Sequence, residues 1–314
     1  MGTADLACAS LEALAKRPGF QIVAVVSQPD KPRGREMRLH PTPVKELAES
    51  LSLTILQPDK ARHPDFVETL RSLKPDLIAV AAYGQILPKS ILEIPSHGCL
   101  NVHTSLLPKY RGAAPIQWAI IDGEHETGVT IMKMDAGLDT GDILAQQRTP
   151  IDPKDDAQTL HDRLATLGGN LLVRTIPQWV AGDIKPIPQL AEGMSYARKI
   201  TKEDGRLDWN LPARVLWNRI RGFTPWPGAY THFSPGGIKP VLLKIWQAEP
   251  VLLHGKPGNV LAVDESGIIV GCGENSLRIL ALQKEGGKRM AAADFLMGHK
   301  LQAGTQLGSG EPPA

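Results

Sequence analysis

The chain has 314 residues, with 35 Lys and Arg against 33 Asp and Glu, and 42% of its residues are hydrophobic. This length suits two ordinary domains, and a near-balanced charge does not by itself indicate a nucleic-acid partner. Cys8, Cys99 and Cys272 lie far apart in sequence, which excludes a disulfide framework and the usual zinc-ligand spacings. No apolar run approaches the ~18 residues of a membrane span, and no signal-peptide pattern begins the chain. We therefore expect a cytoplasmic protein.

The first 182 residues alternate between helical and extended patterns. Helices are predicted at 5–16, 44–50, 64–74, 114–121 and 158–180. Strands are predicted at 21–26, 76–82, 99–103, 127–134 and 143–147, the last two as antiparallel partners. The first two strands are nearly continuous apolar runs, as in strands that are buried on both faces of a parallel sheet. This order predicts an α/β fold with a doubly wound, mostly parallel, Rossmann-like sheet.

The pattern changes after Gly182. Residues 183–208 carry Pro186 and Pro188 without clear periodicity, which indicates a linker. A short helix is predicted at 213–221, followed by strands at 228–233, 241–248, 258–263, 267–272 and 276–283. Short strands separated by Gly and Pro indicate a small β-barrel. We thus predict a first domain at 1–182, a linker at 183–208 and a C-terminal OB-like domain at 209–314.

Polar groups suited to chemistry gather at one strand end. Asn101 and His103 alternate with Val102, so both face the same side of the strand at 99–103. Open α/β sheets build their sites at the C-terminal ends of strands. With Asp139 from a later LDTG turn, an amide, an imidazole and a carboxylate suffice for acyl transfer to an amine. On spacing alone a structural role remains the commoner case for each, and Asp139 also suits an ordinary turn.

The amino-acid sequence of these segments resembles that of a known family. NVHTSLLPKYRGAAPIQWAI at 101–120 and MDAGLDTGDIL at 134–144 are similar to the folate-dependent formyltransferases, and within them to the branch that acts on an aminoacyl-tRNA. Further similar stretches are SQPDKPRGR (27–35), AAYGQILP (81–88), ARKITKEDGRLDW (197–209), IRGFTPWPGAY (220–230) and KRMAAADFL (288–296). The resemblance thus covers nearly the whole chain, with its motifs in the family's order.

The resemblance implies a specific reaction. The donor would be 10-formyltetrahydrofolate as co-substrate, without a metal, and the acceptor would be the α-amine of initiator methionyl-tRNA. Asn101 and His103 would stabilise the tetrahedral oxyanion, and Asp139 would orient His103 and a proton-relaying water. The cofactor-binding residues, which match the loop that holds the folate, are Ser105, Leu106, Leu107 and Pro108. We expect a monomer with no membrane partner.

A basic loop follows the first predicted strand. The tRNA-binding residues that the resemblance implies in it are Lys31, Arg33, Arg35 and Arg38, with Arg35 matching the key arginine of the family's inserted loop. Basic side chains there could meet phosphates near the site, although the same four residues also suit a solvated surface loop. The C-terminal domain resembles the family's OB-type domain, which supports the tRNA.

The chain departs from the family at its beginning. Family members carry a short apolar strand before the Met-Gly-Thr segment, whereas this chain starts at Met1. The first strand of a doubly wound sheet is central, so its loss would leave backbone groups of two neighbours unpaired. We expect the first strand to be missing from this sheet, either because the true start lies upstream, which we favour, or because the chain is a damaged paralogue.

Three other functions stay open. A sister formyltransferase acting on a nucleotide sugar or a purine precursor would share the trio. A non-catalytic RNA-binding paralogue would not need His103. A hydrolase of formyl-folate would use water as the acceptor.

Overall fold

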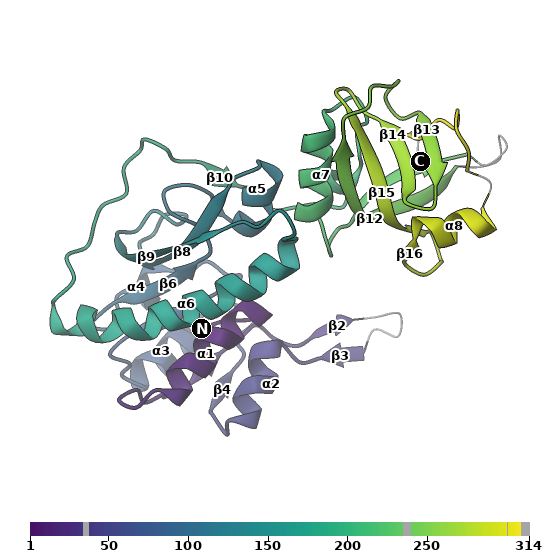
Figure 1. The fold of residues 1–314 in the computed structure, drawn as a ribbon. Coiled ribbons are helices and arrows are strands. Elements are labelled where there is room, and N and C mark those ends of the chain that lie inside the picture. The colour runs from purple at the N-terminus through teal and green to yellow at the C-terminus, as the bar shows by residue number, and fades with distance from the viewer. Residues whose placement is uncertain (34–37, 235–239, 300, 309–314) are drawn as a thin grey trace. The chain divides into compact units, whose positions relative to one another are not determined.

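The computed structural model describes residues 1–314 apart from 34–37, 235–239, 300 and 309–314 (Figure 1). Its contacts divide the chain into two compact units. Unit 1 comprises residues 1–115, 126–150 and 160–197, and unit 2 comprises residues 116–125, 151–159 and 198–314. None of the helices in the described ranges is both long enough and apolar enough to cross a membrane.

The sheet of unit 1 is parallel in one half and antiparallel in the other. Its main part has the order β5 (Ile78–Val80), β6 (Cys99–His103), β8 (Glu126–Lys133) and β9 (Ile143–Pro150). The pair β5–β6 is parallel, while β6–β8 and β8–β9 are antiparallel. A separate parallel pair joins β1 (Val25–Val26) to β4 (Ile55–Leu56). The α/β class predicted from sequence is confirmed, with antiparallel strands at one side of the sheet.

The first three residues connect these two sets of strands. Gly2 N donates to Val26 O at 2.9 Å, while Ala81 N donates to Met1 O at 3.0 Å. Gly2 also forms a parallel bridge to Ala81. This segment therefore lies between β1 and β5, in the place of the expected first strand, but it is too short to pair their full lengths. Strands β1 and β5 are shorter than the runs predicted at 21–26 and 76–82.

Helices cover both faces of this sheet. Those of unit 1 are α1 (Asp5–Lys16), α2 (Pro43–Ser50), α3 (Pro64–Ser72), α4 (Lys89–Leu92) and most of α6 (Ala157–Ala181). On one face, residues of α3 and α4 share an apolar cluster with Ile78, Val80 and Cys99. On the other, Gly168 of α6 lies so close to β6 that a Cβ there would be 2.7 Å from Val102 Cγ1. These helices cover the faces of the sheet but not the ends of its strands, where the site lies.

The segment predicted as a linker, residues 183–208, is partly built into unit 1. Ile187 N donates to Ile143 O at 2.9 Å, and Ile143 N donates back at 2.8 Å. Farther along, β10 (Tyr196–Ala197) pairs in parallel with β7 (Arg111–Gly112). The division between the units falls at Ala197 and Arg198. Sequence periodicity did not reveal this docking because isolated backbone contacts need no apolar repeat.

The basic segment after β1 forms a hairpin rather than the loop expected from sequence. Strands β2 (Lys31–Arg33) and β3 (Arg38–His40) pair antiparallel, with Lys31 opposite His40. Lys31 is exposed, and its Nζ donates to Gln28 Oε1 at 2.8 Å. Arg35 lies outside the described residues.

Unit 2 is built around an antiparallel sheet. The order is β11 (Ala229–Phe233), β12 (Val241–Val251), β15 (Ser276–Lys284), β14 (Gly267–Gly271) and β13 (Val260–Asp264), with β16 (Met290–Ala291) on β15. Its core includes Leu216 and Trp217 of α7 (Ala213–Gly222) and Phe295 of α8 (Ala292–Gly298). Residues of α5 (Pro115–Ile121) from Ile116 onward also belong to this unit. The C-terminal β-domain is therefore confirmed, and it is consistent with an OB-like fold.

Candidate active site

Strand β6 presents two polar side chains side by side at its end. Asn101 and His103 lie on the same face of the strand, opposite Leu100 and Val102. Val102 packs toward α6, so the apolar face holds the strand against the helix. The sequence prediction that Asn101 and His103 share a face therefore agrees with the structure.

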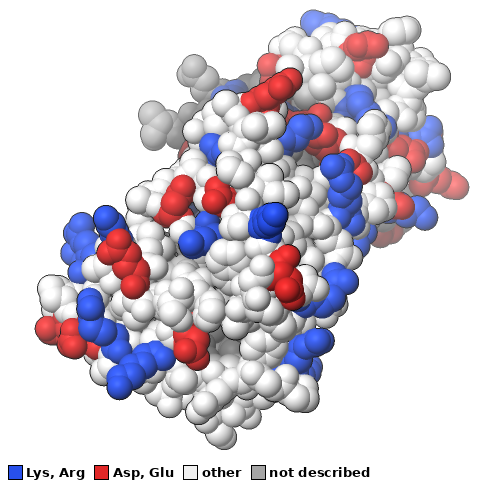
Figure 2. All heavy atoms as spheres, turned by 90° about the vertical axis from the view of Figure 1, so that its left-hand side faces the viewer, with Lys and Arg blue, Asp and Glu red and all other residues white. Residues whose placement is uncertain are grey.

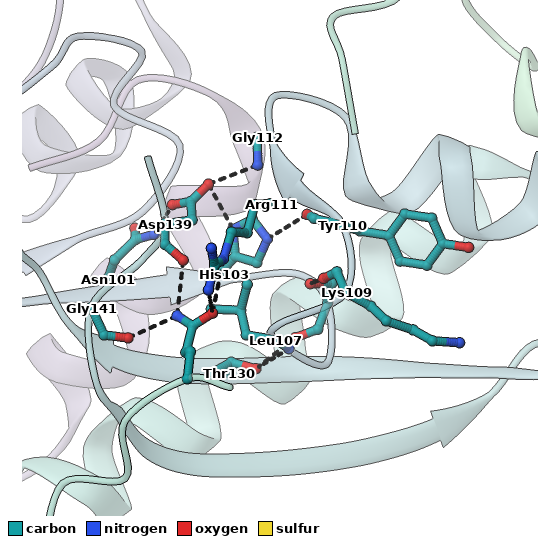
Figure 3. Close-up of polar contacts among 12 residues, drawn as sticks. Asn101, His103, Leu107, Lys109, Tyr110, Arg111, Gly112, Thr130, Asp139 and Gly141 are labelled. Carbon is teal, nitrogen blue, oxygen red and sulfur yellow. Dashed lines mark hydrogen bonds and ion pairs between the residues drawn. The ribbon is translucent and has the colours of Figure 1, made fainter. Parts of the chain in front are cut away.

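Asp139 reaches this pair from the bend between β8 and β9 (Figure 3). Its Oδ2 lies 3.7 Å from His103 Nδ1, and its Oδ1 is 3.5 Å from Asn101 Nδ2. The Gly112 N–H donates to Oδ2 at 2.8 Å. Asp139 has φ of 52°, in the left-handed region that non-glycine residues rarely adopt. The bend therefore aims the carboxylate at both residues of β6.

His103 is held at its second ring nitrogen as well. Its Nε2 lies 2.9 Å from the carbonyl oxygen of Tyr110, which can only accept a hydrogen bond. Nε2 must therefore carry a hydrogen, and the neutral ring has its lone pair on Nδ1, facing Asp139. A proton arriving at Nδ1 would form an imidazolium beside the carboxylate. The Asp139 carboxylate therefore faces the ring nitrogen that is free to accept a proton.

Burial strengthens these contacts. The side chain of His103 is 6% exposed and that of Asp139 is 14% exposed. Electrostatic interactions act more strongly where water is excluded. Asn101 is half-buried. Among the described residues, the hydrogen bond of its amide nitrogen is the long contact to Asp139. The amide therefore retains donor capacity for a developing oxyanion.

The segment from Ser105 to Pro108 uses its own polar groups internally. Ser105 Oγ donates to Lys109 O at 2.6 Å, and Leu107 N donates to Thr130 Oγ1 at 3.1 Å. Gln146 Nε2 donates to Leu107 O at 2.9 Å. Ser105 and Leu107 are buried, whereas Leu106 and Pro108 are half-buried. This segment is therefore a rigid wall beside β6 that offers apolar rather than charged contacts to a ligand.

Comparisons with known proteins agree on one family. Residues 1–176 match the family described as formyl transferase, and residues 199–300 match the formyl transferase C-terminal domain. A methionyl-tRNA formyltransferase of Myxococcus xanthus is 52% identical over 306 residues, covering 98% of this chain and 96% of that protein. One of Geobacter metallireducens is 50% identical over 308 residues, covering 98% and 97%.

The chain belongs to the methionyl-tRNA formyltransferase family. Solved structures show the same fold at lower identity. WlaRD, a sugar 3N-formyl transferase, superposes with a TM-score of 0.64 at 21% identity, covering 88% of this chain and 95% of that one. HypX from Aquifex aeolicus, in complex with tetrahydrofolic acid, gives 0.56 at 24% identity, covering 80% and 43%.

Several residues of this formyltransferase site were not predicted from sequence. Tyr110 and Gly112 follow the SLLP segment, and the backbone carbonyl of Tyr110 contacts His103, while the backbone N–H of Gly112 donates to Asp139. The YRG sequence belongs to the stretch at 101–120 that resembles the family, but residue types do not indicate that the contacts are made by the backbone. Gln189 lies in the predicted linker, and no pattern singled it out.

Within the described ranges, no group of three or more His, Cys, Asp and Glu side chains is placed to hold a metal ion.

Proposed function

We propose that this chain transfers the formyl group of 10-formyltetrahydrofolate to the α-amine of initiator methionyl-tRNA. The main support is about 50% identity to methionyl-tRNA formyltransferases over 98% of the chain, together with the convergence of Asn101, His103 and Asp139. The net reaction forms an amide C–N bond on methionine and breaks the C–N10 bond of the folate. One proton leaves the amine and one is gained by N10.

The residues of the site would act at the formyl carbon. When the amine attacks, the electron pair of the C=O bond moves to oxygen, and the Asn101 amide donates to that oxyanion. His103 carrying a proton on Nδ1 adds a second, charged donor. Asp139 stabilises this imidazolium and orients a bound water, which carries the proton from the amine to N10 as the C–N10 bond breaks and the C=O bond re-forms. Direct attack by the amine needs no nucleophilic side chain.

The folate would lie against the segment from Ser105 to Pro108. Leu106 and Pro108 are its half-buried members, so they are the side chains available for a flat, largely apolar ring. Leu106 packs on Gly128 of β8, where a Cβ would come within 2.6 Å of Leu106 Cδ2. That glycine allows the segment to lie close to the sheet.

The tRNA would be held by both units. We assign phosphate contacts to Lys31, Arg33, Arg35 and Arg38 of the β2–β3 hairpin region, and further support to the domain at 209–314. On the face shown in Figure 2, Lys and Arg are interspersed with Asp and Glu rather than forming one continuous patch. In this proposal the enzyme works as a cytoplasmic monomer, in which one chain supplies Asn101, His103 and Asp139.

The first test is transfer of a labelled formyl group from 10-formyltetrahydrofolate to initiator methionyl-tRNA. Replacing His103 with Ala removes the charged donor, so we expect kcat to fall by about 100-fold or more. The control is His63→Ala, because the His63 side chain is 62% exposed on the surface. Wild-type activity in His103→Ala would refute the assigned role of His103.

The same assay separates the rival functions. Formyl transfer to a nucleotide amino sugar but not to methionyl-tRNA would favour the sister enzymes. Release of formate at the same rate without an acceptor would favour a hydrolase. Binding of tRNA without transfer by the wild-type chain would favour a non-catalytic paralogue.

A further inference from the structure

The exposed segment from Pro186 to Ala197 turns a few side chains toward the active site. Most of its residues are exposed, but Gln189 and Ser195 are half-buried. Ser195 Oγ accepts a hydrogen bond from Tyr110 N at 2.9 Å. The segment lies between the stretches that match the two family domains, which end at residue 176 and begin at residue 199. It is held to unit 1 at both of its ends.

Both the nitrogen and the oxygen of the Gln189 side-chain amide make hydrogen bonds, and these bonds reach two parts of the site. Its Nε2 donates to Asp139 O at 2.8 Å and to Gly141 O at 2.7 Å. Its Oε1 accepts from Arg111 Nε at 3.0 Å and from Nη2 at 2.7 Å. Carbonyl oxygens only accept and a guanidinium only donates, so the amide has one satisfied orientation. Figure 3 labels Arg111, Asp139 and Gly141, the residues that this amide joins, beside Asn101 and His103.

These hydrogen bonds connect the bend that carries Asp139 to Arg111 of β7. Asp139 adopts a left-handed backbone conformation, which persists only where surrounding contacts hold it. Gln189 holds the carbonyls on both sides of Thr140 within that bend. On the other side it holds buried Arg111, next to Gly112, whose N–H binds the Asp139 carboxylate. One amide therefore sets the distance between the carboxylate and its donor.

We propose that Gln189 is a positioning residue for formyl transfer, which acts by holding the Asp139 bend against Arg111 and Gly112. In this role it works through Asp139. The inference rests on the proposed role of Asp139 in catalysis. It extends the site into a segment outside both family-matched domains.

The decisive variant is Gln189→Glu, which keeps the shape and the two acceptor bonds to Arg111. It replaces the donors to Asp139 O and Gly141 O by an acceptor that faces two carbonyls. We expect kcat to fall by about 10-fold to 100-fold, while KM for each substrate changes by less than about 3-fold. The melting temperature should stay near that of the wild type, because a carboxylate pairs well with Arg111. A purely structural residue would not give this split between kcat and KM.

Two further variants complete the test. Gln178→Glu makes the same chemical change on the exposed face of α6 and should leave kcat unchanged. In an Asp139→Ala background, Gln189→Glu should cost less than about 2-fold in kcat, because the group that it positions is gone.

The outcomes distinguish the two levels of the proposal. Wild-type kcat in Asp139→Ala would overturn the catalytic assignment itself. Loss of activity in Asp139→Ala together with wild-type kcat in Gln189→Glu would overturn the positioning role alone. An undiminished effect of Gln189→Glu in the Asp139→Ala background would also overturn it, because Gln189 would then act by another route.

Discussion

His103 illustrates how single residues acquire a role through contacts on both sides. Its Nε2 faces a backbone carbonyl and its Nδ1 faces Asp139, so the ring can neither rotate nor exchange tautomers without losing a contact. The residue types Asn101, His103 and Asp139 were predicted from sequence. The carbonyl of Tyr110 and the N–H of Gly112, which orient them, carry no residue-specific signal because every residue has a backbone.

The three cysteines show the effect of burial on side-chain chemistry. Burial raises the pKa of Cys99 and of Cys272 to about 12, and raises the pKa of Cys8 to about 11. An apolar environment disfavours the charged thiolate, and for Cys8 the neighbouring acidic residues add to the effect. These thiols should therefore stay protonated and unreactive in the folded protein near neutral pH.

A loss of stability in alkali follows from these shifts. The unfolded chain releases its thiol protons near pH 9, whereas the folded chain retains them until about pH 12, so stability is lost as pH rises through this range. At pH 10 each buried thiol should account for about 1 kcal/mol of that loss. Urea unfolding at pH 8 and pH 10 measures it. A Cys99→Ala, Cys272→Ala double variant should lose less between these values, and an equal loss would contradict the explanation.

At the scale of elements, close approaches position the catalytic strand. Helix α6 carries Gly168 against Val102 of β6 and Gly169 against α1, where a Cβ would lie 2.7 Å from Ala9 O. A larger side chain at either position would separate α6 from its neighbours. The long amphipathic helix was predicted from its periodicity, but periodicity does not show which turn lies closest to another backbone.

Replacing Gly169 with Ala tests this packing. The new methyl group meets a backbone oxygen that cannot move independently, so overpacking should outweigh the better helix propensity of Ala. We expect the free energy of unfolding to fall by about 1–2 kcal/mol in urea titrations. Gly298→Ala in α8 is the matched control, because its Cβ would meet no atom within 4 Å among the described residues. Equal stability of both variants would show that α6 has room to shift.

At the scale of the whole molecule, each unit is built from segments that are not consecutive in the sequence. Residues 116–125 and 151–159 belong to unit 2, although they lie inside the region predicted as the first domain at 1–182. A Cβ on Gly222 of α7 would lie 2.6 Å from Ile121 Cγ1, and Arg221 Nη1 donates to Asp155 O at 3.0 Å. Unit 2 is therefore not a simple C-terminal piece.

A fragment of residues 198–314 should consequently be less stable than unit 2 in the full chain. Without residues 116–125, the apolar face of α7 would be exposed to water. Hydrogen exchange of the amides in β12 and β15 measures the difference, with the full chain as the reference. Equal protection in fragment and full chain would show that the barrel is self-sufficient.

The sequence by itself determined helices α1, α2, α3, α5, α6 and α7, the longer strands, the two fold classes and the residue types at the centre of the site, whereas α4 and α8 were not predicted. These properties follow from local periodicity and from motifs that lie close together in the chain. Tertiary structure decided which elements Met1–Thr3 connect and where residues 183–208 dock. It also decided which earlier segments of the chain belong to unit 2 and that Gln189 lies beside Asp139. Such contacts join residues about 50 positions apart through single backbone groups, so their energy depends on spatial proximity and leaves no repeat in the sequence.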